Sequence, residues 1–329
     1  MVLTRRSLRL ATVALTALTA VALATSAAPA AAPRVVRTLP VPPGFAGHLA
    51  YDPASGRLWL LSFGPPAGTA GPSRLYELSP ETGEVLARAD LPLQGSFAPP
   101  AVVGGRLYVG IYWESRIYEI ATDPGSFGKV TGTVEVPGTA ALGLGGDGHW
   151  RYPFLEFAGL APAPGGNLLV QASYAGELIT LDRASGAVLR RVAIPRGLGG
   201  IAAAPGADGR TLLIADRDAE NAAVVDKVQR FDVQPAFLPV PTKRSRWGSF
   251  ASRPEPKTVS WLLLDPETGA VLASAEVAGS PVYAGSAALL RREPAPGAPF
   301  GRFLLLALGG SGLLTLEWTP EPSSGGLTK

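Results

Sequence analysis

The sequence predicts an all-β chain built from a repeated unit of short strands, and three observations support this. Glycine and proline supply 40 and 32 of the 329 residues, which is roughly twice their usual combined share. Only 17% of the residues are charged, although 47% are hydrophobic, so long helices with charged outer faces are not expected. Short apolar runs, separated by turn-forming residues, recur along the chain. Together these features are typical of strands joined by tight turns.

Residues 1–32 are expected to form an export signal. Three arginines within residues 5–9 precede an apolar stretch over residues 10–23, and a small-residue tract over residues 22–32 offers cleavage sites. Residues 4–9 resemble a twin-arginine signal, so this route and the general secretion route both stay open. An uncleaved membrane anchor is the competing interpretation. With cleavage, the mature protein is soluble, has no membrane span and is exported to the periplasm or the extracellular space.

Charge and cysteine content exclude several classes of function. The formal net charge is +3, and loss of the three leader arginines brings it to about zero, so no nucleic-acid partner is expected. The chain contains no cysteine, which excludes disulfides, thiolate metal sites, a cysteine nucleophile and lipid attachment through cysteine. An exported protein without disulfides depends on a large core for its stability.

The main signal is a hairpin motif that occurs in three places, at residues 78–86, 181–189 and 264–272. Each copy has Asp or Ser, two turn residues, Thr or Ser, then Gly and a new alternating strand. The Asp or Ser side chain starts such a turn by bonding the backbone, and Gly adopts the positive φ that closes it. A divergent fourth copy covers residues 120–125.

Upstream of each hairpin, a small-residue strand and a glycine turn lead into a strongly apolar strand. Five such units begin near residues 47, 97, 156, 199 and 282. Each unit holds four strands, which is the pattern of β-propeller blades. The sequence therefore predicts a propeller over residues 33–319, followed by a flexible tail over residues 320–329.

The fourth and fifth units depart from the regular repeat. The fifth unit lacks a fourth strand, and residues 34–40 are expected to supply it and so to close the ring. The fourth unit is interrupted by an insertion over residues 217–257. We expect five blades; a six-bladed ring, with residues 227–232 as a strand of an irregular blade, is the alternative.

The repeated hairpin resembles the blades of YncE-like and quinoprotein-like propellers. Residues 213–217, with residues 228–232, are similar to a broken NHL repeat, and residues 154–160 resemble the E-G motif of gluconolactonase-like and esterase-like phytase propellers. These resemblances imply the propeller superfold and carry no activity with them. Quinoprotein-like blades place Trp after the hairpin glycine, whereas Glu84, Ala187 and Ala270 stand here. Binding of pyrroloquinoline quinone is therefore not expected.

His48, Glu156 and Asp216 are the candidate residues for chemistry. His48 stands at the start of the first unit and would shuttle a proton, with Glu156 nearby; a histidine hydrogen-bonded at a turn is the alternative. The resemblance to lactonase-like propellers implies that Glu156 and Asp216 hold a divalent ion such as Ca²⁺. The alternating oxygens of Asp216, Asp218 and Glu220 also suit Ca²⁺, and solvated charges at the start of a loop are the alternative.

Aromatic and histidine side chains near the second strands are candidate ligand contacts: Trp113, Tyr174, His149 and Trp150. Packing between blades, or a plain surface loop, are their structural alternatives. The leading hypothesis is a binding protein whose channel-face loops hold a small ligand or an envelope protein. Two alternatives stay open: a Ca²⁺-dependent hydrolase of the lactonase or phytase-like esterase type, and a structural partner that uses residues 217–257 as a contact arm.

Overall fold

The computed structural model of the chain describes residues 32–41, 47–62, 72–93, 97–111, 116–136, 143–144, 150–151, 157–172, 176–195, 197–206, 210–218, 257–280, 287–309 and 312–323. Nearly all of these residues lie in strands or in the turns between them, and η1 (Pro164–Gly166) is a single 3-10 turn. In this part of the chain, no helix has the length and apolar character needed to cross a membrane.

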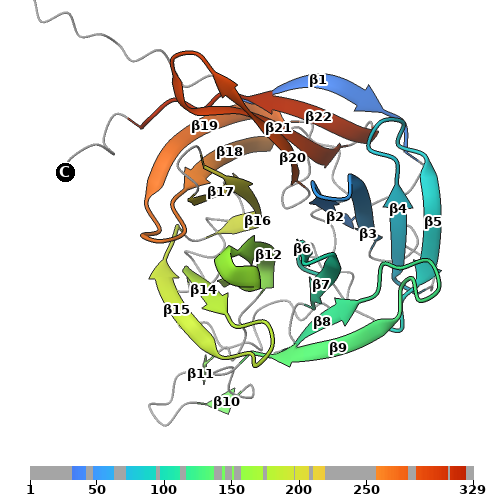
Figure 1. Ribbon diagram of the computed structural model, residues 1–329. Coiled ribbons are helices and arrows are strands. Elements are labelled where there is room, and N and C mark those ends of the chain that lie inside the picture. Colours follow the sequence, from blue (N-terminus) through green and yellow to red (C-terminus); the bar gives the residue numbers. More distant parts are fainter. Residues whose placement is uncertain are drawn as a thin grey trace, which may run out of the picture.

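Five four-stranded antiparallel sheets stand around a central axis as the blades of a β-propeller (Figure 1). Blade 1 contains β2 (Gly47–Asp52), β3 (Arg57–Ser62), β4 (Arg74–Leu78) and β5 (Val85–Asp90). Blade 2 contains β6 (Ala101–Val103), β7 (Arg106–Gly110), β8 (Arg116–Ile120) and β9 (Val130–Glu135). Blade 3 contains β12 (Phe157–Ala163), β13 (Asn167–Ala172), β14 (Glu177–Leu181) and β15 (Val188–Ala193). Blade 4 contains β16 (Leu198–Pro205), β17 (Thr211–Asp218), β18 (Lys257–Leu264) and β19 (Val271–Ser280).

Blade 5 joins the two ends of the propeller. It contains β20 (Ala288–Ala295), β21 (Ala298–Gly309), β22 (Gly312–Trp318) and β1 (Arg34–Leu39). The N-terminal strand β1 pairs antiparallel with β22, from Arg34 opposite Glu317 to Leu39 opposite Leu313. This arrangement confirms the five blades and the closure by the N-terminal strand, and the six-bladed alternative is wrong. Closure in this way covers the edge of β22, which would otherwise be exposed.

The chain beyond the last strand of blade 5 crosses to the neighbouring blade. The backbone N–H of Ser323 donates a hydrogen bond of 2.9 Å to the carbonyl oxygen of Leu272 in β19. This hydrogen bond links the segment after residue 319 to blade 4.

The repeated hairpins form the turns that their sequences predict. Gly83, Gly186 and Gly269 have φ values of 75°, 72° and 74°. In the second of these turns, the N–H of Gly186 donates to the Asp182 carbonyl oxygen at 2.8 Å, and the Asp182 carboxylate accepts from the Ser185 N–H at 2.7 Å. The aspartate and the glycine therefore have the roles expected of them.

The three hairpin glycines also dock blades 1, 3 and 4 onto the preceding blades. A Cβ atom on Gly83 would lie 2.5 Å from the carbonyl oxygen of Pro40, which directly follows β1 of blade 5. A Cβ on Gly186 would overlap the Glu135 carbonyl oxygen of blade 2, and one on Gly269 would overlap the Ala193 carbonyl oxygen of blade 3. Only glycine allows this approach.

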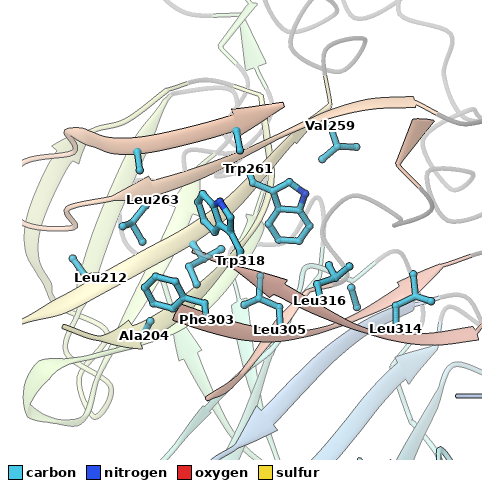
Figure 2. Packing of buried hydrophobic residues seen from close by; sticks show 14 residues of the cluster. Ala204, Leu212, Val259, Trp261, Leu263, Phe303, Leu305, Leu314, Leu316 and Trp318 are labelled. Carbon is cyan, nitrogen blue, oxygen red and sulfur yellow. The ribbon is translucent and has the colours of Figure 1, made fainter. Parts of the chain in front are cut away.

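Tryptophans do pack between the blades, but from within the strands. Trp261 of blade 4 and Trp318 of blade 5 are each 1% exposed, and both belong to one apolar cluster with Phe303 (Figure 2). The ring centroids of Phe303 and Trp318 are 6.3 Å apart. Burial of rings of this size contributes strongly to the free energy of folding.

Candidate functional site

The innermost strand of each blade is antiparallel to the second strand, so the start of one lies beside the end of the other. We call the end of the ring at which the innermost strands begin the N-terminal face. Seven polar side chains are buried in the described part of the chain, and five of them lie at this face: His48, Ser62, Ser73, Gln171 and Asp216. Their exposed fractions are 7%, 5%, 4%, 0% and 2%. Buried polar groups are therefore concentrated at one end of the channel.

Gln171 and Asp216 occupy equivalent positions in blades 3 and 4. In each blade, a leucine of the second strand pairs with the last residue before the hairpin: Leu168 with Leu181 in blade 3, and Leu213 with Leu264 in blade 4. Gln171 and Asp216 each lie three residues after that leucine. By the same register, blade 1 has Leu61 at this position and blade 2 has Gly110. A blade can thus form with leucine or glycine at this position.

The innermost strands facing these two residues are also alike. Gln171 lies opposite Gly159, and Asp216 lies opposite Gly200. A break in strand register directly precedes each of these glycines, between Phe157 and Gly159 and between Leu198 and Gly200. Blades 3 and 4 therefore share one local design, in which a bulge and a glycine on the innermost strand leave room for a buried polar side chain.

The Gln171 amide lies between two innermost strands. Its Nε2 donates a hydrogen bond of 2.9 Å to the Leu198 carbonyl oxygen of β16, which ties blade 3 to blade 4. Its Oε1 is buried without a hydrogen-bond partner. A Cβ on Gly159 would lie 3.1 Å from this oxygen and 2.9 Å from the Ile201 nitrogen, so glycine is needed for the amide to fit.

His48 and Asp216 are strand residues, and both take part in polar or electrostatic contacts. His48 lies within β2, opposite Leu61, so it is not at a turn. Asp216 lies within β17, between Gly200 and Trp261, and it is not a solvated charge at the start of a loop. Strand pairing continues through Asp218, opposite Val259, so the first two residues of the expected insertion belong to β17.

Most of the other predicted site residues lie outside the described part of the chain: Trp113, His149, Glu156, Tyr174 and Glu220. Trp150 is described as part of β11 (Trp150–Arg151), which pairs with β10 (Gly143–Leu144). In Figure 1 this pair lies beyond the outer strands of blade 3, away from the channel. Within the described ranges, no three His, Asp or Glu residues gather as a metal site would require. The pairing of His48 with Glu156, and the ion held by Glu156 and Asp216, stay predictions.

A cavity of about 290 Å³ lies along the central axis, below the buried polar residues. At its upper end it is lined by Leu49, Leu160 and Ile201, which directly follow His48, Gly159 and Gly200 in the sequence. At its lower end it is lined by prolines, Pro53, Pro164 and Pro205. Tyr51 and Thr211 supply the polar side-chain atoms of the lining, and burial raises the pKa of the Tyr51 phenol, which nearby Glu81 and Asp52 raise further.

The charged pairs of the first two blades lie at the opposite end of the second strands. Arg57 and Glu77 form a bidentate pair at 2.8 Å, and Arg106 contacts Glu119 at 2.9 Å. The Tyr108 hydroxyl donates a 2.8 Å hydrogen bond to Glu119. Burial and this hydrogen bond together raise the pKa of Tyr108 to about 12. These groups connect strands within a blade and leave the channel free of their charge.

Sequence reasoning missed both Gln171 and the cavity. The signal for Gln171 was a single polar residue inside an apolar strand that otherwise reads as core, in residues 167–172. Its meaning depends on Gly159 and Leu198, which are distant in the sequence, so the strand alone does not reveal it.

Comparison with known proteins supports the fold and leaves the activity open. No protein-family model and no curated protein matches the chain. Among solved structures, glutaminyl cyclase from Myxococcus xanthus is similar, with a TM-score of 0.51, 14% identity, and coverage of 88% of this chain and 97% of that one. Hydrazine synthase from Kuenenia stuttgartiensis has a TM-score of 0.39 at 13% identity, over 83% of this chain and 59% of that one. At 14% identity, the match to glutaminyl cyclase shows a similarity of fold alone.

Proposed function

We propose that this chain is an exported binding protein that holds a small ligand at the N-terminal face of its central channel. The observation that carries the proposal is the burial of three polar side chains, His48, Gln171 and Asp216, at the end of the ring where an apolar-lined cavity begins. His48 directly precedes Leu49 of the lining, and Gln171 and Asp216 pair with the glycines that precede Leu160 and Ile201. Ligand sites commonly combine an apolar concavity with a few polar groups that fix orientation. The arrangement here has both parts.

The polar residues are better explained by recognition than by stability. Burying an amide or a carboxylate is unfavourable unless its hydrogen bonds are satisfied. Leu61 and Gly110 occupy the equivalent position in blades 1 and 2, where the sheet forms equally well. The sheets of blades 1 and 2 therefore form without a polar group at this position.

The proposal is tested by a ligand screen on the mature protein, followed by calorimetric titration of each compound that raises the melting temperature. The variants Asp216→Leu and Gln171→Leu copy the residue that blade 1 has at this position. Each is expected to weaken binding at least tenfold while the protein stays folded. The control Thr315→Val removes a buried hydroxyl from β22, outside this group of residues, and should leave binding unchanged. Unchanged affinity in both leucine variants would contradict the proposal.

A metal-dependent hydrolase is the second candidate, favoured by the burial of His48 and Asp216 at the same face. Here Glu156 and Asp216 would hold a Ca²⁺-like ion, and His48 would move a proton. Metal analysis of the mature protein, and the Ca²⁺ dependence of its melting temperature, separate the two candidates. A stoichiometric ion that is lost in Glu156→Ala supports the hydrolase; no ion and no shift support the binding protein.

A further inference from the structure

We infer that the ligand is a small amphiphile, with an ammonium head toward Asp216 and Gln171 and an apolar tail inside the central channel. This inference rests on the proposed function and adds the chemical class of the ligand. Three features of the described residues lead to it: the shape of the cavity, the chemistry of its lining, and the acceptor groups at its upper end.

The cavity is long enough for an extended apolar group. Its lining runs along β12 from Leu160 to Pro164, a length of about 13 Å at the usual rise per strand residue. The neighbouring innermost strands line it over similar stretches, from Leu49 to Pro53 and from Ile201 to Pro205. A tail that starts at the N-terminal face can therefore extend along the channel axis.

The lining of the cavity suits an apolar group. Alanine and proline supply most of the lining residues, and no charged side chain is among them. Pro100 and Pro162 lack the N–H group that a polar occupant would use as a donor. Val102, Ala202 and Ala203 are partly exposed although they lie at the centre of the ring, so the cavity is open to solvent. A charged head is therefore excluded from the channel itself, whereas a hydrocarbon tail gains by burial.

The groups at the upper end of the cavity accept hydrogen bonds. The Oε1 of Gln171 is fully buried, lacks a partner and lies beside Ile201, which lines the cavity. Asp216 occupies the equivalent position in the next blade and brings a carboxylate, which accepts hydrogen bonds when ionised. A head that donates, such as a primary ammonium, complements both groups, and a carboxylate head would repel Asp216.

The first experiment measures binding of straight-chain alkylammonium ions, from butyl to dodecyl, to the mature protein by calorimetry below the micellar concentration. Affinity is expected to rise about fourfold with each methylene, until the tail fills the channel, and then to level off. Alkyl carboxylates of equal length should bind at least tenfold more weakly, because their charge meets Asp216.

Two channel variants test where the tail lies. Ala202→Leu narrows the cavity and is expected to shorten the optimal chain, whereas Val102→Ala widens it and should lengthen or broaden the optimum. Thr315→Val serves as the control, with an unchanged optimum. Circular dichroism and melting curves confirm that each variant is folded before its affinity is interpreted.

The outcomes separate this inference from the proposed function. If affinity is independent of chain length, or if neither channel variant moves the optimum, the tail does not lie in the channel and the inference is overturned. The proposed function still stands in that case, provided that other ligands from the screen depend on Asp216. If carboxylates bind as well as ammonium ions, the assignment of the head is wrong. If no alkylammonium ion binds and the screen also finds no ligand, the inference and the proposed function are both contradicted.

Discussion

The docking of hairpin glycines onto neighbouring blades gives the sharpest test of the fold. Gly186 lies at the turn of blade 3 with φ of 72°, and a Cβ there would overlap the Glu135 carbonyl oxygen of blade 2. The same Cβ would also lie 3.3 Å from the Val134 side chain. Gly56 has nearly the same backbone conformation, φ of 70°, but a Cβ there would meet nothing within 4 Å. The pair separates backbone conformation from contact between blades.

The magnitudes follow from this difference. Gly56→Ala places an L-residue in the left-handed region, which costs about 1 kcal/mol of the free energy of unfolding. Gly186→Ala carries the same term, and it also forces the backbone of two blades apart, which adds about 1–3 kcal/mol by analogy with overpacked cores. We therefore expect losses of about 1 kcal/mol for Gly56→Ala and about 2–4 kcal/mol for Gly186→Ala.

Urea unfolding of the mature protein, followed by tryptophan fluorescence and circular dichroism, measures both losses. Coincident transitions from the two probes are needed before free energies are compared. Equal losses in Gly56→Ala and Gly186→Ala would show that blades 2 and 3 do not meet at this glycine, and the account of the repeat motif would then be wrong.

Three further predictions concern ring closure, the C-terminal segment and pH. Leu39→Ala truncates a buried residue of β1 and should lower the free energy of unfolding by about 2–4 kcal/mol. Val36 lies on the same strand but is 45% exposed, so Val36→Ala should change the free energy of unfolding by less than about 0.5 kcal/mol. Similar losses in the two variants would contradict closure of the ring through β1. Removal of residues 320–329 should lower the free energy of unfolding by about 1 kcal/mol, because the hydrogen bond from Ser323 to Leu272 is lost. An unchanged unfolding curve would count against that contact. Because the folded state raises the pKa of Tyr108 to about 12 from an ordinary value of 10.0, Tyr108 stabilises the protein below pH 10, and this contribution disappears as the pH rises toward 12. Tyrosine absorbance should show one late-titrating group in the wild type that is missing in Tyr108→Phe; full titration near pH 10 would refute the raised pKa.

The sequence predicted the blades because their determinants are local. The turn at residues 182–186 needs only an aspartate side chain, a serine and a glycine with positive φ, all within five positions. The closing strand over residues 34–39 was also predictable, since the fifth unit lacked one strand and a ring leaves no edge uncovered. What the motif did not reveal was the second role of the glycine, because the Glu135 carbonyl belongs to another blade.

The candidate site was predicted less well, for a physical reason. Asp216 and His48 were identified as polar residues near strand ends, but their burial depends on how the strands pair. Three consecutive charged residues, at positions 216–218, predicted the start of a loop. In the structure, however, pairing with β18 continues through Asp218. Gln171 carried no motif at all, and the space for its amide comes from Gly159 on the innermost strand.

A crystal structure of the mature protein with its tightest alkylammonium ligand tests the central claim most directly. We expect the tail along the channel between the five innermost strands, and the nitrogen within hydrogen-bonding distance of Asp216 or of Gln171 Oε1. A ligand bound on the outer strands, with ordered water alone in the channel, would contradict the claim that the N-terminal face is the binding site.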